Sequence, residues 1–178
     1  MRSSELRGLR WSDVDFDRGE IHVQQRFDAW NQAGAPKSKS SRRGIPMPAG
    51  GFVSNTLRHW REDCPEGPLD LVFPNGAGNP ENHSNILTRG LKAAQIRAGV
   101  VRQDGKAKYA LHALRHYFAS AQAEAGEASL KDVQAWLGHS SFQMTSDTYS
   151  HRFTDKEADA TKFRAAERAL RAVATKTG

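Results

Sequence analysis

The chain has 178 residues, of which 38% are hydrophobic, and this length and composition suit one packed domain and exclude a wholly disordered chain. Its single cysteine, Cys64, excludes an intrachain disulfide and a cysteine-based zinc site, and the absence of a long apolar run or signal peptide predicts a soluble, cytoplasmic protein with no membrane partner. The formal net charge of +6 favours a polyanionic partner, DNA or RNA, although a basic solvated surface would give the same balance.

The first third of the chain predicts the end of a helix and then a small antiparallel sheet. "SSELRGLRW" has the spacing of a helix, and residues 17–19 form a turn before the alternating Ile21 and Val23. The chain returns as a short strand around Ile45 and Met47. We therefore expect one small sheet within residues 13–48, with a basic, flexible segment at its second hairpin.

Helical patterns follow from residue 52 onward. Phe52, Thr56 and Trp60 recur every four residues, and three later helices are expected to end at Gly99, Gly126 and Gly138, the last of them capped by Ser129. Further helices are expected around Met144–Tyr149 and in the tail, residues 154–178. The predicted fold class is α+β, mainly helical, with a small antiparallel sheet near the N-terminus and no interdomain linker.

The segment "LHALRHYFA" places His112, Arg115 and His116 near one face of a helix. The forked guanidinium of an arginine and two imidazoles can donate hydrogen bonds to the oxygens of a phosphate. A solvated polar face is the structural alternative. The H-x-x-x-H spacing also occurs in metal sites, but the expected glutamate and a third ligand are not evident.

The segment "LGHSSFQMTSDTYSH" sets His139 ten residues before Tyr149 in a polar stretch. A tyrosine can attack phosphorus when cations stabilise the charge on the non-bridging oxygens and a donor protonates the leaving oxygen. A lone tyrosine is more often a packing residue. The accompanying arginines, the basic hairpin and the H-x-x-R helix favour the chemical role.

From Arg2 to about Phe153 the sequence resembles the catalytic domain of the tyrosine recombinases, the phage integrase family. "MRSSELRGLRWSDVD" is similar to its first box, "APKSKSSRRGIPMP" to its lysine-bearing hairpin, and the two segments above to its second and third boxes. The four segments occur in the order and spacing of the family. The resemblance implies that family's fold, with the first catalytic arginine at Arg2 rather than Arg7 or Arg10 and with Glu5 as its supporting carboxylate.

The resemblance also implies the roles of the site residues. Arg2 and Arg115 hold the scissile phosphate of DNA, and His139 donates a further hydrogen bond to it. His112 assists proton movement, and Tyr149 is the nucleophile that becomes linked to the 3′ phosphate. No cofactor and no metal are implied, and the sequence contains no phosphate-binding glycine loop.

Two lysines of the hairpin could protonate the leaving 5′ oxygen. Lys37 is preferred to Lys39 on the pattern "PKSKSSRRGIP", although both fall on one side of an alternating strand. The remaining cations of the hairpin are expected to make non-specific contacts to DNA phosphates. These DNA-binding residues are Lys39, Arg42 and Arg43.

The predicted function is that of a site-specific DNA recombinase that acts through a 3′-phosphotyrosyl intermediate. The family's first catalytic helices and its N-terminal DNA-binding domain have no counterpart before Arg2, so residues 1–178 are expected to be a truncated catalytic domain. A type IB topoisomerase and a non-catalytic DNA-binding remnant are the alternatives. The family implies duplex DNA as partner, a tetramer on DNA and a monomer or dimer without it.

The tail carries an apolar stripe at three- and four-residue spacing, made by Phe163, Ala166, Leu170 and Val173. Such a stripe is expected to be buried, either on its own domain or on a second copy. A solvated tail is the alternative.

Overall fold

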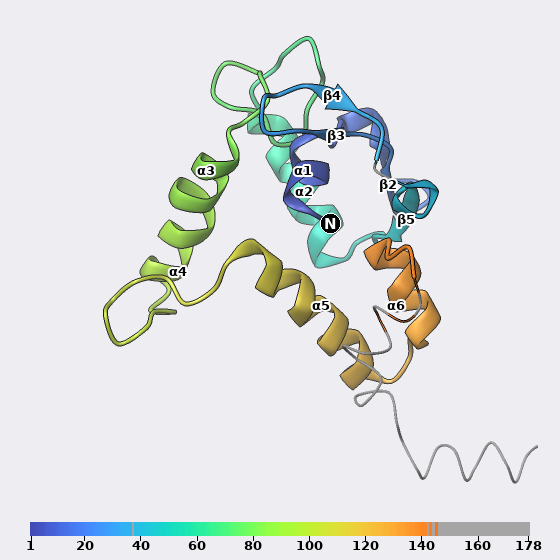
Figure 1. The fold of residues 1–178 in the computed structure, drawn as a ribbon. Helices are drawn as coiled ribbons and strands as arrows, with labels where there is room; N and C mark the ends of the chain where they lie inside the picture. The colour runs from blue at the N-terminus through green and yellow to red at the C-terminus, as the bar shows by residue number, and fades with distance from the viewer. Residues whose placement is uncertain (37, 142, 144, 146–178) are drawn as a thin grey trace, which may run out of the picture.

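A computed structural model of the chain describes residues 1–36, 38–141, 143 and 145 (Figure 1). Its α-helices are α1 (Ser3–Arg7), α2 (Phe52–Asp63), α3 (His83–Asn85), α4 (Ala93–Arg97), α5 (Leu111–Ala125) and α6 (Leu130–Leu137). Within these residues, no helix has both the length and the apolar character needed to cross a membrane. The helix expected around Met144–Tyr149 and the tail, residues 154–178, lie outside the described residues.

The sheet predicted for residues 13–48 is present as two sheets. A three-stranded antiparallel sheet joins β1 (Val14–Asp15), β2 (Glu20–Val23) and β5 (Arg43–Pro46), and a separate pair joins β3 (Arg26–Phe27) to β4 (Ala33–Gly34). The break between β2 and β3 coincides with a contact to a segment distant in the sequence. Gln25 donates from Nε2 to the carbonyl of Gly8 at 2.8 Å, which draws the chain across the end of α1.

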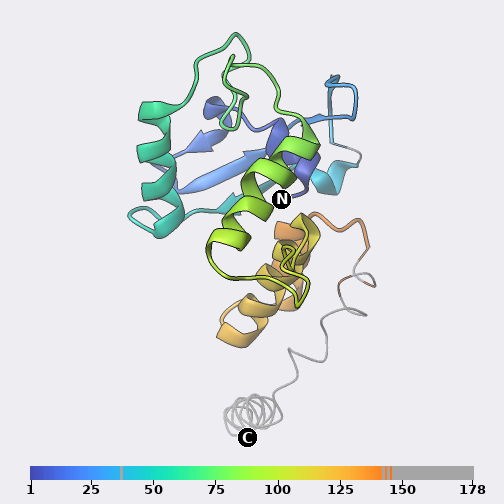
Figure 2. The ribbon, with the colours of Figure 1, turned by 90° about the vertical axis from the view of Figure 1, so that its left-hand side faces the viewer.

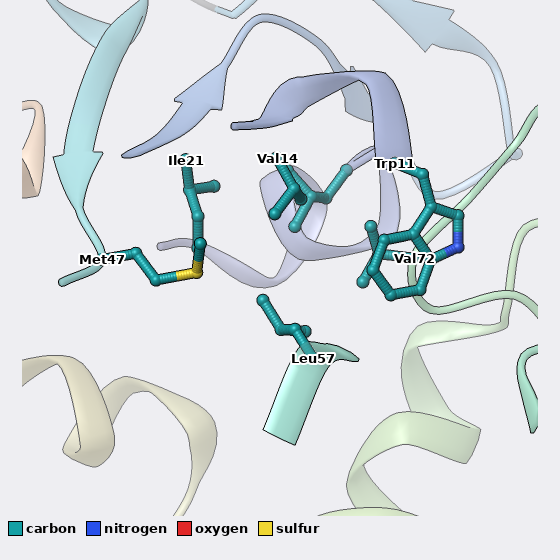
Figure 3. Close-up of a cluster of buried hydrophobic side chains, with 7 residues drawn as sticks. Trp11, Val14, Ile21, Met47, Leu57 and Val72 are labelled. Atoms are coloured by element: carbon teal, nitrogen blue, oxygen red, sulfur yellow. The ribbon is translucent and has the colours of Figure 1, made fainter. Parts of the chain in front are cut away.

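The main hydrophobic core lies between the three-stranded sheet and α2 (Figure 3). The alternation of β2 turns Ile21 and Val23 to its buried face. The segment 70–72 closes the core from the other side, where Val72 donates to the carbonyl of Leu9 at 2.8 Å. The cluster consists of Leu9, Trp11, Val14, Ile21, Met47, Leu57 and Val72.

A second, smaller core joins α5 to α6, which lie together below the sheet in both ribbon views (Figures 1 and 2). Ala119, Val133 and Leu137 form its buried centre. The helix α6 begins and ends where the sequence predicts. Ser129 caps its first turn, with the Ser129 hydroxyl accepting from the amide of Asp132, and Gly138 ends it in the left-handed conformation.

The helix predicted to end at Gly99 is present but is not a regular α-helix. It runs from α3 through a π-helical segment, Ile86–Lys92, into α4. Gly90 lies within that segment, and its low helix propensity weakens the preference for α geometry there. Gly99 adopts the expected left-handed conformation at the end of the helix.

The helix α2 buries a different face from the one marked by Phe52, Thr56 and Trp60. Ser54 and Leu57 are its buried residues, whereas Phe52 is 86% exposed. Trp60 is half-buried and donates from Nε1 to the carbonyl of Val72. The four-residue spacing predicts the helix correctly, but only one of those three residues touches the core.

Leu57 and Phe52 therefore make a matched pair on one helix. We expect Leu57→Ala to lower the free energy of unfolding by roughly 2–5 kcal/mol, because it leaves a cavity in the main core. Phe52→Ala should change it by less than about 0.5 kcal/mol, since that side chain is solvated. Urea unfolding of both variants measures the difference, and equal midpoints would contradict the placement of the core.

Candidate active site

The C-terminal end of α6 receives three arginine side chains from distant parts of the chain. The carbonyls of residues 136–138 accept hydrogen bonds from Arg43, Arg115 and Arg2, in that order. The first of these bonds measures 2.6 Å and the third 3.1 Å. The last carbonyls of a helix lack partners within the helix and carry the negative end of its dipole, so cations are stabilised there.

Gly138 makes this arrangement possible. Its φ of +64° suits glycine, and a β-carbon at this position would lie 2.8 Å from Nη1 of Arg43. Its amide donates to the carbonyls of Gln134 and Ala135, which closes the helix. The left-handed turn thus ends α6 and sets His139 beside the three arginines.

Glu5 lies between two of the arginines and is only 3% exposed. It accepts from the Arg2 backbone amide at 2.7 Å and from Nη1 of Arg2 at 3.0 Å. Arg43 donates to its two carboxylate oxygens at 3.1 and 2.9 Å. Burial alone would raise the pKa of Glu5, but the hydrogen bonds from Arg43 and Arg2 outweigh it and lower the pKa to about 2.

Arg43, which was predicted to contact a DNA phosphate, is instead buried against internal partners. Its side chain is 5% exposed, and its donors serve Glu5 and the carbonyls of Ser41 and Trp136. Arg43 is the first residue of β5, opposite the buried Val23, and its side chain continues inward from that position. The two arginines are adjacent in a basic segment, and nothing in the sequence distinguishes the buried Arg43 from the exposed Arg42.

Arg115 and His112 approach from α5. Arg115 is 6% exposed, whereas His112 is exposed and packs edge-on against His116 at 4.6 Å between ring centroids. Partial desolvation of the ring, followed by the neighbouring charges of His116, Arg115 and Arg2, lowers the pKa of His112. Arg2, His112 and Arg115 line one cavity of about 450 Å³, so the structure brings these three predicted residues together.

His139 lies beside this cluster, directly after Gly138. Its Nδ1 is 2.7 Å from the hydroxyl of Thr145, and with that hydroxyl as donor the proton of the neutral ring is on Nε2. Burial and the charges of Arg115, Arg2 and Arg43 lower the pKa of His139 to about 4. At neutral pH it is therefore an uncharged hydrogen-bond donor.

Two other arginines of the first box have structural partners. Arg7 is buried, and its guanidinium donates to the carbonyls of Asp28 and Glu81 and to the side chain of Asn31. Arg10 forms an ion pair with Asp13 at 2.9 Å. Of the three candidate arginines, only Arg2 lines the cavity that holds Arg115 and His112.

The arrangement is chemically suited to a phosphate with a developing charge. Two arginines, an imidazole N–H and a second imidazole converge where a helix end and a buried carboxylate fix their positions. Charge-assisted donors of this kind stabilise oxyanions most where they are held in advance.

Residues 1–156 match the family model described as "Phage integrase family". The chain belongs to the phage integrase family. Among known proteins, it is 33% identical over 173 residues to the tyrosine recombinase XerC of Xylella fastidiosa strain 9a5c, a match that covers 95% of this chain and 51% of that one. It is 29% identical over 184 residues to a XerC-like tyrosine recombinase of Caldanaerobacter subterraneus subsp. tengcongensis, covering 90% of this chain and 44% of that one.

Solved structures of the family share the fold. A fragment of the Tn1549 transposon integrase in complex with a circular intermediate DNA superposes with a TM-score of 0.70 at 21% identity, over 93% of this chain and 54% of that one. XerA recombinase superposes with a TM-score of 0.65 at 20% identity, over 93% of this chain and 53% of that one. The fold is that of a tyrosine-recombinase catalytic domain, and the chain spans about half the length of the relatives that it matches.

Several predicted integrase residues cannot be placed. Lys37 and Tyr149 lie outside the described residues. The backbone of Lys39 opens a 3-10 turn, Lys39–Ser41, but its side chain also lies outside the described set. Arg42 is exposed. Of the six predicted catalytic residues, the structure thus brings together Arg2, His112, Arg115 and His139.

Glu5 gives a test by pH. The pKa of Glu5 is lowered from 4.5 to about 2, so the ionised form of Glu5 stabilises the folded state above about pH 4.5. This stabilisation is on the order of 3 kcal/mol, and it is lost as the pH falls from 4.5 toward 2. We expect Glu5→Gln to be less stable at pH 7, because Arg43 loses its buried partner, and the difference from wild type to shrink below pH 4.5. Urea midpoints across pH measure this difference.

The matched control is Glu62→Gln, an exposed carboxyl on α2. Its unfolding should follow that of the wild type throughout. A difference between wild type and Glu5→Gln that stays constant down to pH 2 would contradict an ionised Glu5 as the source of the stabilisation.

Proposed function

We propose that this protein is a site-specific DNA recombinase that breaks and rejoins duplex DNA through a 3′-phosphotyrosyl intermediate. The observation that carries the proposal is the convergence of Arg2, His112, Arg115 and His139 beside the C-terminal end of α6. Membership of the phage integrase family supports it, as do the names of its relatives, which are tyrosine recombinases.

In the proposed reaction the DNA backbone supplies the reacting phosphate. Arg2 and Arg115 bind its two non-bridging oxygens, and neutral His139 donates one hydrogen bond. The phenol oxygen of Tyr149 forms a bond to phosphorus as the bond to the 5′ oxygen breaks. His112 assists removal of the phenol proton, and Lys37 protonates the departing oxygen.

The covalent link between tyrosine and phosphate keeps the energy of the phosphodiester. Attack by a free 5′ hydroxyl therefore reverses the step, with the proton returning to Tyr149, and needs neither ATP nor a metal ion. We propose duplex DNA as the partner, contacted by Arg42 and Lys39 of the hairpin, and assembly as a tetramer on DNA from monomers or dimers. A cytoplasmic location accords with such a substrate.

The nucleophile gives the decisive test. Incubation with a pool of duplexes of mixed sequence that carry nicks should yield DNA that stays attached to the protein in denaturing detergent, because the nick releases the strand needed for resealing. Tyr149→Phe should abolish this adduct while leaving DNA binding unchanged, since only the attacking oxygen is lost. Gel analysis measures both, and DNA binding without any adduct by the unaltered chain would favour a non-catalytic DNA-binding protein.

The choice between the two lysines can be tested with the leaving group. We expect Lys37→Ala to slow cleavage of an ordinary phosphodiester by about 100-fold or more, but to slow a substrate with a sulfur leaving atom much less, because a thiolate departs without a proton. Lys39→Ala is the matched control and should affect both substrates alike. Equal losses on both substrates for Lys37→Ala would remove it from the general-acid role.

A further inference from the structure

The arginines around the site differ in the partners of their side chains. The side chain of Arg26, in β3, is half-buried and forms no hydrogen bond or ion pair with any residue that the structure describes. Its Nε is fully buried without an acceptor among those residues. A cation partly removed from water is costly unless an anion or acceptor meets it. Among the described residues, Arg26 therefore has no anion or acceptor that compensates for its partial burial.

A cavity of about 340 Å³ lies beside Arg26. Arg2 shares its lining, and Arg2 also lines the cavity with His112 and Arg115. The two cavities therefore share Arg2 and Ser4 in their linings. The hydroxyl-bearing residues Ser38, Ser41 and Ser140 complete the polar wall, and hydroxyls donate readily to phosphate oxygens.

The charge of this second cavity is positive. Glu5 is its one acidic residue, and its carboxylate is held by Arg2 and Arg43. Arg43 contacts this carboxylate but does not line the cavity. Arg26 therefore adds a positive charge that no carboxylate of the described residues offsets.

The backbone of Arg26 is in contact with the helix whose N-cap is Arg2. A β-carbon added to Gly8, at the end of α1, would lie 2.9 Å from the Cα of Arg26, so the two segments are in contact. Gln25 bonds to the Gly8 carbonyl, and Arg26 pairs with Gly34 across the β3–β4 ladder. These contacts fix the position of the segment that carries Arg26 relative to the segment that carries Arg2.

We infer that Arg26, with Ser38, Ser41 and Ser140, forms a second phosphate site, which takes the DNA phosphate next to the reacting one. The inference rests on the proposed function, because it requires the first phosphate to lie at Arg2. The site positions the DNA strand over the reaction centre and takes no part in bond breaking.

The salt dependence of DNA binding tests this site. The slope of the logarithm of the binding constant against the logarithm of salt concentration changes by about 0.9 for each phosphate neutralised. For a short duplex of mixed sequence, we expect Arg26→Gln to reduce the slope by about 0.9 and Arg26→Lys to restore most of it, because the charge returns. Fluorescence anisotropy over a salt series measures the slope.

Arg18→Gln is the matched control. Arg18 is an exposed arginine in the β1–β2 turn, at the opposite end of β2 from the connection to Arg26. The Arg18→Gln variant removes the same charge as Arg26→Gln but should leave the slope unchanged. An equal reduction in both variants would mean that only net charge matters and would overturn the second site.

A second variant keeps the test independent of the folding of Arg26→Gln. Ser140→Asp changes an exposed residue and sets a carboxylate in the lining of the same cavity, so it should reduce the slope by a similar amount with Arg26 intact. An unchanged slope in Ser140→Asp, beside normal binding by the wild type, would refute the site and leave the proposed function standing. Absence of salt-dependent binding by the wild type would instead refute the proposed function.

Inorganic phosphate, at constant ionic strength, separates the two possible sources of the anion. Inorganic phosphate should raise the melting temperature of the wild type and of Arg26→Gln by the same amount. The reason is that the second site is proposed to bind a phosphate of a DNA strand that Arg2 already holds, and a free phosphate has no such attachment. A rise specific to the wild type and as large as that produced by duplex DNA would assign the cavity to a free anion and overturn the inference.

Discussion

The end of α6 is the point on which the site depends. Its last carbonyls, those of residues 136–138, have no partners within the helix, and three arginines satisfy them. Those arginines come from the N-cap of α1, from β5 and from α5, so one helix end connects segments that are up to 136 residues apart in sequence. Gly138 is the residue that permits this, because its left-handed turn and missing β-carbon leave room for Arg43.

The electrostatic balance of this cluster decides what it can bind. One carboxylate, that of Glu5, and the negative end of a helix dipole face three guanidinium groups. Burial, together with the remaining positive charge, suppresses protonation of His139 and keeps it an uncharged donor at neutral pH. A bound phosphate would supply the missing negative charge. The excess of positive charge that helps to lower the pKa of His139 therefore favours the anionic substrate proposed for the site.

Local signals in the sequence predict much of the fold. Ser129 and Gly138 mark the ends of α6, and Gly99 marks the end of α4, because capping and left-handed turns depend on residues close in the chain. The division of the sheet at Gln25 and the buried face of α2 were not predicted, since both depend on contacts with distant segments. For the site, the motifs predict four residues that the structure brings together, while the roles of Lys37 and Tyr149 remain predictions.

The arginines show most clearly why sequence alone stops short of the site. Arg42 and Arg43 are adjacent and identical in chemistry, yet one is exposed and the other is bound to Glu5 inside the protein. Arg26 follows no motif, but it carries a half-buried charge that no described residue meets. What an arginine can do for a ligand depends on which of its donors the fold has already used. The three-dimensional packing decides which donors are used, so it divides a run of cations into those that hold the fold and those that face the solvent.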